Sequence, residues 1–344
     1  MKNVILFAIP VFFLLIGIEL WLDRKRGTGF YRLADSLASL SLGSLSQIAN
    51  FFTKGVGALS YIYAYRHLAL WDLPDHGWPV WLAALVLYDF CYYWVHRCGH
   101  ELNLMWAAHV VHHSSEEYNL STALRQTGTG FLIGWIFYLP MAVIGIPPTV
   151  FIGAGLINLL YQYWVHTRHI GRMGWFDYMF ASPSNHRVHH GQNDYCIDRN
   201  YGGMLMLWDH LFKSFVAERD NEPIVYGIRG ALASHDPIWG NLHYYAYMLQ
   251  AMRQAKGWGE RISIWFKSPG WNAPRADFRS ADFKPYRPGF SKIGARTAFA
   301  LFVLLLLGTT GFIGLAPTLP LAIAGAYGLA LTGGFWFLGR RLSA

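Results

Sequence analysis

The sequence predicts an all-α protein, a polytopic integral membrane helical bundle with a cytoplasmic histidine-rich centre for two metal ions. Two observations lead to this prediction. Of the 344 residues, 53% are apolar and only 14% are charged, and several apolar runs are long enough to span a bilayer. Eight of the fifteen histidines lie in three short clusters, spaced HxxxH, HxxHH and HxxHH, which is typical of a metal centre.

The N-terminal apolar run, residues 4–22, precedes a charged run at 23–26. A secretory signal carries its positive charge before the apolar region, so we expect an uncleaved anchor instead. The positive-inside rule then puts residues 23–26 in the cytoplasm. A second span over 36–52 leads outward, and a third over 79–95 returns and brings His96 to the cytoplasmic face.

The middle of the chain predicts two shallower membrane segments. Residues 56–70 are aromatic, and we expect them to form an interfacial or re-entrant segment. Residues 131–145 and 149–165 are apolar and are separated by a proline-rich breaker at 146–148, which predicts a hairpin that dips into the membrane. This hairpin returns His166 to the cytoplasmic face.

A last apolar hairpin, 297–315 and 319–337, is flanked by basic residues that again face the cytoplasm. The polar stretch 166–296 contains the third histidine cluster and no span, so all the clusters lie on one side of the membrane. We expect four regions: an N-terminal membrane anchor region (1–78), a catalytic core (79–220), a cytoplasmic or interfacial cap (221–296) and a C-terminal membrane hairpin (297–344).

The net charge of +8 lies mostly in the cytoplasmic segments, where it favours anionic lipid headgroups. No basic run is dense enough to indicate nucleic-acid binding. The three cysteines show no CxxC spacing, which fits reduced thiols in a cytoplasmic setting.

The spacing of the histidines explains how they could meet. Residues three and four apart share a helix face, so His96 can converge with His100, and His109 with His112 and His113. Imidazole suits iron, zinc, copper or nickel. A tetrahedral zinc is complete with four ligands, so eight histidines predict two ions.

This donor set favours redox chemistry at a membrane surface. Neutral imidazoles leave a metal ion strongly electrophilic, and a lipid chain would reach it from the bilayer while oxygen and electrons arrive from solvent. Oxidation of an unactivated C–H bond fits better than hydrolysis by metal-bound hydroxide. The alternative from another class is a membrane metal transporter or metal sensor. A conduction path would put ionisable residues inside spans, whereas these histidines fall just beyond span ends.

The histidine boxes resemble those of the fatty acid hydroxylase and sterol desaturase superfamily of membrane di-iron oxygenases, over residues 81–215. Within it, the runs HRCGHE, HVVHHSSEEYNLSTALRQ and SPSNHRVHHGQNDYCIDRNYGG are most similar to members that cleave glyceryl ether lipids. The resemblance implies that the irons are bound by His96, His100, His109, His112, His113, His186, His189 and His190, with His166 as a ninth ligand. The HTRH run also offers His169, but its spacing is narrower than the HxxxH of related enzymes.

Three polar residues complete the candidate site. Glu101 is expected either to hydrogen-bond a ligand imidazole or to be solvated. Asn185 is expected to cap a helix, and Asp198 either orients a ligand histidine or belongs to a structural turn. The polar run 114–126 could contact a headgroup or cofactor or be solvated, and residues 222–296 carry no motif that predicts a role.

The resemblance also implies the cofactors and partners. It predicts two iron ions, a lipid substrate and an external electron donor, which is tetrahydrobiopterin in the ether-cleaving members and a cytochrome b5 or ferredoxin chain in many relatives. The expected enzyme is a membrane-bound, O2-dependent monooxygenase that hydroxylates a C–H bond of a lipid, and with a glyceryl ether as substrate this hydroxylation would cleave the ether bond. The alternative within the class is a fatty acyl, sterol or carotenoid hydroxylase or desaturase.

Overall fold

The computed structural model describes residues 4–272, 278–290 and 293–343. Helices account for all the regular structure in these residues, and strand-like pairing is limited to two isolated bridges, Phe180 with Leu205 and Gly191 with Tyr226. The prediction of an all-α protein is therefore confirmed.

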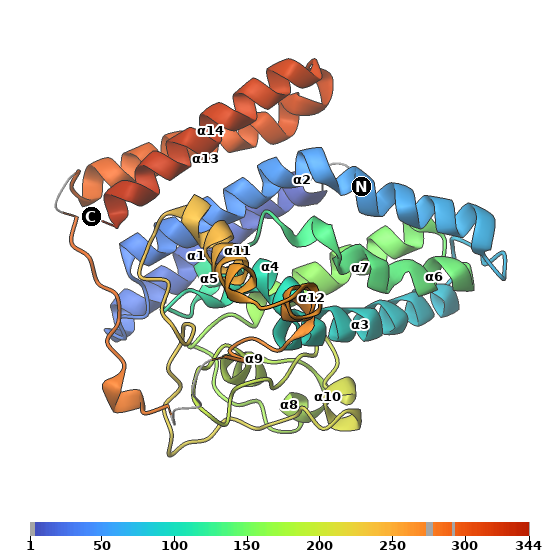
Figure 1. The fold of residues 1–344 in the computed structure, drawn as a ribbon, viewed down its shortest axis with the longest axis horizontal. Helices are drawn as coiled ribbons and strands as arrows, with labels where there is room; N and C mark the ends of the chain where they lie inside the picture. The colour runs from blue at the N-terminus through green and yellow to red at the C-terminus, as the bar shows by residue number, and fades with distance from the viewer. Residues whose placement is uncertain (1–3, 273–277, 291–292, 344) are drawn as a thin grey trace.

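The long helices α2, α3 and α7 run along the longest axis of the molecule (Figure 1). They share one apolar core, in which Tyr61 of α2 packs with Ala84 of α3 and Ala154 of α7. With the N-terminal helix, their bounds are α1 (Val4–Arg26), α2 (Leu33–Leu68), α3 (Trp78–Glu101) and α7 (Pro148–Trp164).

Helix α2 is a single helix of 36 residues, which corresponds to a length of about 54 Å at 1.5 Å per residue. It contains the predicted second span and all but the last two residues of the predicted interfacial segment at 56–70. A re-entrant segment was therefore wrong for these residues, whereas their position at a membrane interface stays a prediction. Tyr61 and Ala64 are buried against α6 and α7, whereas Tyr63 on another face of the helix is 64% exposed.

The expected hairpin over 131–165 has one regular arm and one broken arm. The second arm is α7, but the first consists of η1 (Gly130–Leu132), η2 (Gly134–Tyr138) and α6 (Leu139–Ile144). The turn follows at Gly145, whose φ of 100° is left-handed and where a Cβ would lie 2.0 Å from the carbonyl oxygen of Trp71. The turn is thus confirmed, whereas a continuous first arm is not.

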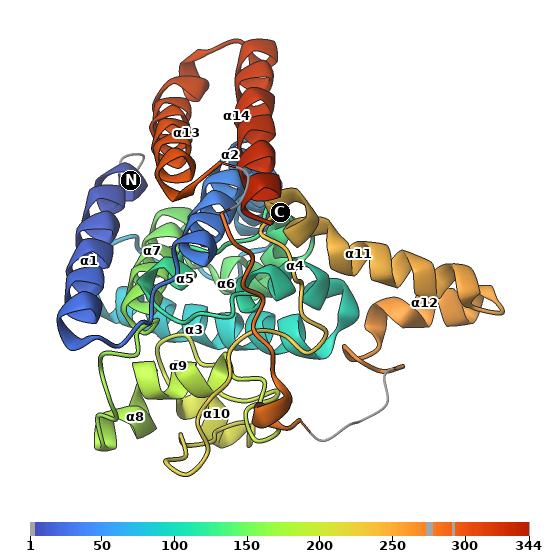
Figure 2. The same ribbon diagram turned by 90° about the vertical axis from the view of Figure 1, so that its left-hand side faces the viewer.

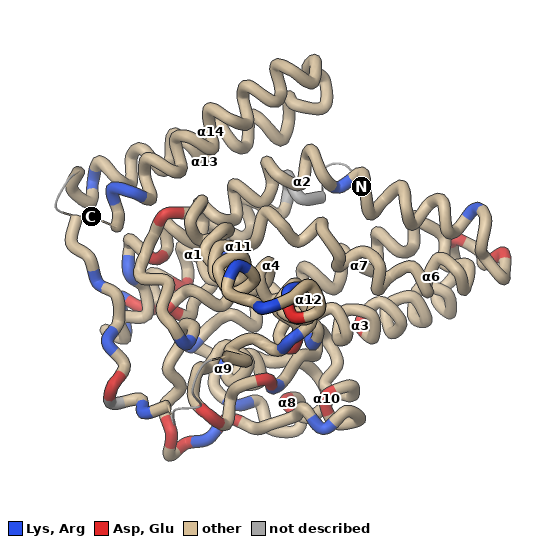
Figure 3. The backbone as a smooth tube through the Cα atoms, in the orientation of Figure 1, with Lys and Arg blue, Asp and Glu red and all other residues tan. Residues whose placement is uncertain are grey.

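Two helices in the described residues are long and apolar enough to cross a membrane, over Ala295–Thr318 and Leu321–Leu342. They comprise α13 (Ala295–Leu315), the short η4 (Ala316–Thr318) and α14 (Leu321–Leu342), and they form the predicted C-terminal hairpin. Figure 2 shows this hairpin stacked on α2, where Phe312 and Phe335 join Ile48 in one apolar cluster. In Figure 3 its basic residues lie at the end where the chain terminates.

Shorter helices surround the C-terminal end of α3 and build the candidate site. A capping box begins α9, because the Ser182 amide donates to Asn185 Oδ1 (3.1 Å) and the Asn185 amide donates to Ser182 Oγ (3.4 Å). The remaining bounds are α4 (Asn103–His113), α5 (Leu120–Ala123), α8 (Trp175–Met179), α9 (Pro183–His189), α10 (Leu207–Leu211) and η3 (Ser280–Asp282).

A helical hairpin of α11 (Pro237–Gln254) and α12 (Trp258–Phe266) crosses the long helices. Its helices appear nearly end-on in Figure 1, where α2 and α3 appear lengthwise, and Figure 2 shows the hairpin projecting to one side. Asp236 caps α11 by accepting hydrogen bonds from two backbone amides. The hairpin is attached to α4, since the Asn103 amide donates to the carbonyl of Lys267 (2.9 Å).

Candidate metal centre

The structure brings all nine predicted histidines together in two groups, within each of which the potential ligand atoms lie within 4.8 Å of one another. Helices α3, α4 and α9 supply seven of them, and His166 and His190 lie just after the ends of α7 and α9. The first group contains His96, His100, His109, His113 and His189, and the second contains His112, His166, His186 and His190.

Within each group the Nε2 atoms converge. In the first group, His113 Nε2 lies 3.1 Å from both His100 Nε2 and His109 Nε2. In the second, His166 Nε2 lies 3.2 Å from His112 Nε2 and 3.0 Å from His186 Nε2. One metal ion in each group would accept these lone pairs.

Backbone carbonyls fix the orientation of four of the imidazoles. The Nδ1–H groups of His96 and His189 donate to the carbonyls of Tyr201 (2.8 Å) and Arg199 (2.9 Å). In the second group, the Nδ1–H groups of His112 and His166 donate to carbonyls at 3.0 Å and 2.9 Å. A histidine that donates from Nδ1 presents its Nε2 lone pair to a metal.

This arrangement of protons fits metal binding. His112 and His166 each carry their proton on Nδ1, so two bare lone pairs face each other across 3.2 Å, which is repulsive unless a cation lies between them. In the first group, His96 Nε2 and His189 Nε2 are buried and have no hydrogen-bond partner. Buried acceptors of this kind are costly without a partner, and a metal ion would satisfy them.

Burial also keeps these side chains in the ligating form. It lowers the pKa of His96 to about 3 and that of His112 to about 4, and it moves the pKa of the other seven in the same direction. The imidazoles are therefore neutral at physiological pH, which is the form that binds metals.

The loop that carries the orienting carbonyls is held by a buried aspartate that the sequence analysis missed. Asp209 is fully buried and accepts hydrogen bonds from the amides of Tyr201 (2.8 Å) and Gly202 (2.7 Å). A Cβ at Gly202 would lie 2.5 Å from the carbonyl oxygen of Leu205, so only glycine fits there. The carbonyl acceptors themselves have no side-chain signature, although the DRNYGG run marks the loop that contains two of them.

The other predicted polar residues lie outside the two groups. The carboxylate of Glu101 pairs with Arg97 (2.9 Å), and no described hydrogen bond joins it to a histidine. Asp198 Oδ1 lies 4.0 Å from His100 Nδ1, which is too far for a hydrogen bond. Asn185 has a capping role, as the reciprocal partner of Ser182.

His169 also lies outside the two groups. Its Nδ1 is 3.4 Å from the guanidinium of Arg26, and its ring packs against Phe30. The structure therefore separates the two histidines of the HTRH run: His166 joins the second group, and His169 contacts the end of α1 and the residues after it.

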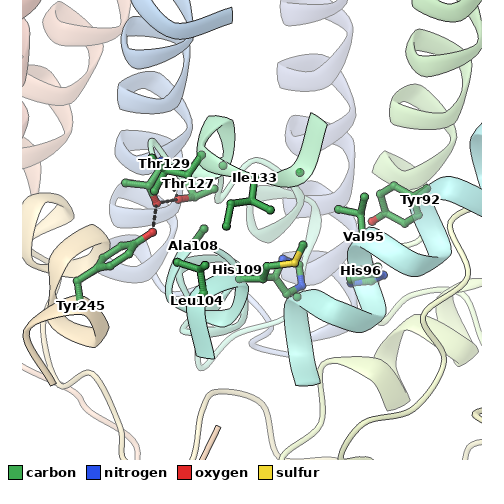
Figure 4. A pocket seen from close by; sticks show the side chains of 15 residues that line it. Tyr92, Val95, His96, Leu104, Ala108, His109, Thr127, Thr129, Ile133 and Tyr245 are labelled. Atoms are coloured by element: carbon green, nitrogen blue, oxygen red, sulfur yellow. Dashed lines mark hydrogen bonds between the residues drawn. The ribbon is translucent and has the colours of Figure 1, made fainter. Parts of the chain in front are cut away.

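An apolar pocket of about 130 Å³ opens against the first group (Figure 4). His96 and His109 form part of its wall, and aliphatic side chains such as Val95, Leu104 and Ile133 form much of the rest. The described residues that line it include no lysine, arginine, aspartate or glutamate. A hydrocarbon chain therefore suits this pocket, and it would lie beside the converging imidazoles.

Comparison with known proteins agrees with the resemblance of the histidine boxes. A family model described as fatty acid hydroxylase matches residues 81–214. Alkylglycerol monooxygenase of Homo sapiens is 43% identical over 268 residues, which are 77% of this chain and 59% of the human protein. The protein of the same name from Danio rerio is 40% identical over 310 residues, covering 87% of this chain and 68% of that protein.

A more distant relative is the ornithine lipid hydroxylase OlsE of Rhizobium tropici, 27% identical over 236 residues, which are 65% of this chain and 69% of that protein. The chain spans roughly three fifths to two thirds of the length of the alkylglycerol monooxygenases from human, Xenopus tropicalis and Danio rerio. No solved structure matches the chain.

Proposed function

Because this chain belongs to the fatty acid hydroxylase family, with alkylglycerol monooxygenases among its homologues, we propose that it is a membrane-bound di-iron monooxygenase that hydroxylates a C–H bond of a lipid. The observation that carries the proposal is the convergence of nine imidazoles, most of them buried, in two groups, one of which borders an apolar pocket. Two bound irons would supply the activation of O2 that an unactivated C–H bond requires.

The protein residues supply position and surroundings for that chemistry. The nine histidines would hold the ions, and the carbonyls of Tyr201 and Arg199 fix two of the rings so that their Nε2 atoms would be available to an ion in the first group. The aliphatic wall of the pocket would exclude water and hold a hydrocarbon segment beside His96 and His109. The alternative of a metal transporter or sensor gives no reason for an apolar pocket at the ligands.

We propose a glyceryl ether as the substrate, by analogy with the relatives named alkylglycerol monooxygenase. One oxygen atom of O2 would enter the C–H bond beside the ether oxygen, and the other would leave as water, with two electrons and two protons from an external reductant. The hemiacetal product then collapses to a fatty aldehyde and glycerol. We propose tetrahydrobiopterin as that reductant.

The exposed surface of several helices supports a membrane location. In both α13 and α14, 28% of the apolar stretch is buried. Most of their hydrocarbon side chains therefore face outward, unlike those of a core helix in a soluble protein. On α12, Trp258, Ile262 and Phe266 recur every fourth residue and are 76%, 58% and 61% exposed. Such a stripe, on a helix that crosses the long helices, suits the plane of a bilayer surface.

We further propose a multi-pass topology with the metal centre on the cytoplasmic face. Asp220 lies near the centre, two residues from Glu218, which pairs with Arg187 of α9 (2.7 Å). Asp75 lies at the opposite end of α3, which is about 36 Å long. Both carboxylates are exposed.

This topology predicts opposite labelling of two introduced cysteines. A membrane-impermeant maleimide should label an Asp220→Cys variant in inside-out vesicles only and an Asp75→Cys variant in right-side-out vesicles only. The wild-type chain, with cysteines at 91, 98 and 196, gives the background. Labelling of both variants from one side would contradict the proposed multi-pass arrangement.

Metal content and lipid turnover test the proposed activity. The purified protein is reconstituted anaerobically with ferrous iron and then given O2, tetrahydrobiopterin or a ferredoxin or cytochrome b5 system, and a panel of lipids. We expect about two irons per chain, as the two histidine groups require, and O2-dependent conversion of an alkylglycerol to a fatty aldehyde. Oxidation of a different lipid would replace the substrate and keep the chemistry. Fewer than two ions, with no O2 consumption on any lipid, would refute the proposal.

A further inference from the structure

The apolar pocket contains a cluster of hydroxyl groups at the end away from His96. Thr127 and Thr129 come from the segment before η1, and Tyr245 comes from α11 (Figure 4). Tyr245 lies outside the segment that the fatty acid hydroxylase model matches and inside the region for which the sequence predicted no role. The cluster is therefore a feature that the histidine boxes do not explain.

The hydroxyl protons of this cluster are all committed within the protein. The Tyr245 hydroxyl donates to Thr129 Oγ1 (3.0 Å), and the Thr127 hydroxyl donates to Asn241 Oδ1 (3.3 Å). Thr127 and Thr129 are also joined, at 3.0 Å. Because a hydroxyl has one proton and that of Thr127 is used by Asn241, Thr129 must be the donor in this pair.

Asn241 fixes the donor-to-acceptor direction of this series of hydrogen bonds. The side-chain amide of Asn241 donates to the carbonyl of Pro237 (2.9 Å), which leaves Oδ1 facing the pocket segment. There Oδ1 also accepts the backbone amide of Gly128 (2.9 Å). Asn241 is therefore the final acceptor of this series of hydrogen bonds. Each hydroxyl donates to the next residue, in the order Tyr245, Thr129, Thr127 and Asn241.

The cluster can only accept hydrogen bonds from a ligand. Thr127 Oγ1 accepts from both the Thr129 hydroxyl and the Thr129 amide (3.1 Å), so its lone pairs are used. The Tyr245 oxygen and the second lone pair of Thr129 remain available. A ligand group at this end of the pocket must therefore donate a hydrogen bond.

The surrounding charge limits the ligand further. The described lining residues include no basic side chain that would pair with a phosphate or carboxylate, and burying an unpaired anion in this apolar wall is costly. An ester or ether oxygen can only accept hydrogen bonds, so it would face the acceptors of Tyr245 and Thr129 without a partner. A neutral free hydroxyl satisfies both conditions.

We propose that Tyr245 and Thr129 form a headgroup subsite, which selects lipids with a free, uncharged hydroxyl over anionic lipids and over lipids whose hydroxyl is esterified or etherified. Asn241 fixes the direction of the hydrogen bonds, so that the subsite accepts a hydrogen bond from the lipid. This subsite belongs to the pocket of the proposed monooxygenase and so rests on that function. It assigns part of the substrate specificity to α11, which reaches the pocket from outside the histidine-bearing core.

Binding to the metal-free protein tests the subsite without requiring turnover. The probe is displacement of a fluorescent alkyl lipid by three ligands with the same chain: 1-O-hexadecylglycerol, its difluoro analogue with fluorine in place of both hydroxyls, and its 3-phosphate. Fluorine is close to hydroxyl in size but cannot donate. We expect the diol to bind about tenfold more tightly than either of the others, because only the diol can donate a hydrogen bond to the subsite without burying a charge.

Each of two variants should weaken this preference, and their combination should remove it. Tyr245→Phe and Thr129→Val each delete one of the two acceptors, so the affinity for the diol should fall toward that for the difluoro analogue in each, and should equal it in the double variant, while the affinity for the analogue itself stays unchanged. Tyr247→Phe is the matched control, since Tyr247 lies two residues further along α11 and its hydroxyl bonds to Asn272 outside the pocket. It should keep the full preference.

Equal affinity of the wild-type protein for the diol and the difluoro analogue would overturn the subsite, as would an undiminished preference in both pocket variants. These outcomes are separate from the proposed activity. Wild-type turnover of alkylglycerol with no binding preference would refute the subsite alone. A clear preference in a protein that never consumes O2 would support the subsite and refute the monooxygenase.

Discussion

Replacing His166 with alanine should reduce the metal content of the protein from about two ions to about one per chain and abolish lipid turnover. The Nε2 atom of His166 lies between those of His112 and His186, at 3.2 Å and 3.0 Å, so it is central to the second group. Its loss leaves three imidazoles there. We expect turnover to fall by more than the ~10–100-fold that follows loss of an outer hydrogen-bond partner.

His169 provides a matched control for this experiment, because it lies three residues away in the same HTRH run and contacts Arg26 and Phe30 instead of the metal centre. The His169→Ala variant should keep about two ions per chain. Elemental analysis of the purified proteins, together with aldehyde production, gives the result. Retention of two ions in the His166→Ala variant would show that His166 is not a ligand.

Replacing Asp209 with asparagine should weaken metal binding at a distance from the ligands. The two carboxylate oxygens accept the amides of Tyr201 and Gly202, and the Ser214 hydroxyl donates to Oδ1 (2.7 Å). An asparagine has one carbonyl oxygen and would point an NH2 group at one of these donors. The loop must then shift, and the Tyr201 carbonyl would no longer hold His96. We expect metal affinity to fall about 10–100-fold.

The same substitution should reduce the free energy of unfolding by about 2–3 kcal/mol, since a buried charged acceptor is lost. Metal titration and thermal unfolding in detergent measure the two effects. Asp220→Asn is the control, because that carboxylate is exposed and pairs only with Arg172 among the described residues. Unchanged affinity in the Asp209→Asn variant would mean that the carbonyl of Tyr201 does not determine the position of His96.

The histidines were predictable because helical spacing gives a direct rule for which side chains share a face. His96 with His100, and His109 with His113, follow from that rule alone, and both pairs lie in the first group. The same rule placed His112 with His109, which was wrong, because His112 belongs to the second group. The placement of His166 depended on the resemblance, since one histidine after an apolar run has no spacing to distinguish it. The exclusion of His169 required the structure, which shows the chain turning away after α7.

Other parts of the site could not be read from residue types. The acceptors for His96 and His189 are backbone carbonyls, which every residue carries, so their role depends on the path of the loop. Tyr245 lies far along the chain in a region without a motif. In the same way, the composition of residues 56–70 does not show that most of this stretch continues the long helix α2, which the structure shows.

The centre has one more consequence, which follows from two pairs of neighbours in the chain. His112 and His113 belong to different groups, and so do His189 and His190; the rings of His113 and His190 stack at 4.3 Å. Since consecutive Cα atoms are separated by a fixed ~3.8 Å, the backbones of α4 and α9 set the distance between the two ions. Any binding event that orders these helices for one ion also orders the ligands of the other. Metal uptake by the wild-type chain should therefore be cooperative, with an ion in one group raising the affinity of the other group for its own ion.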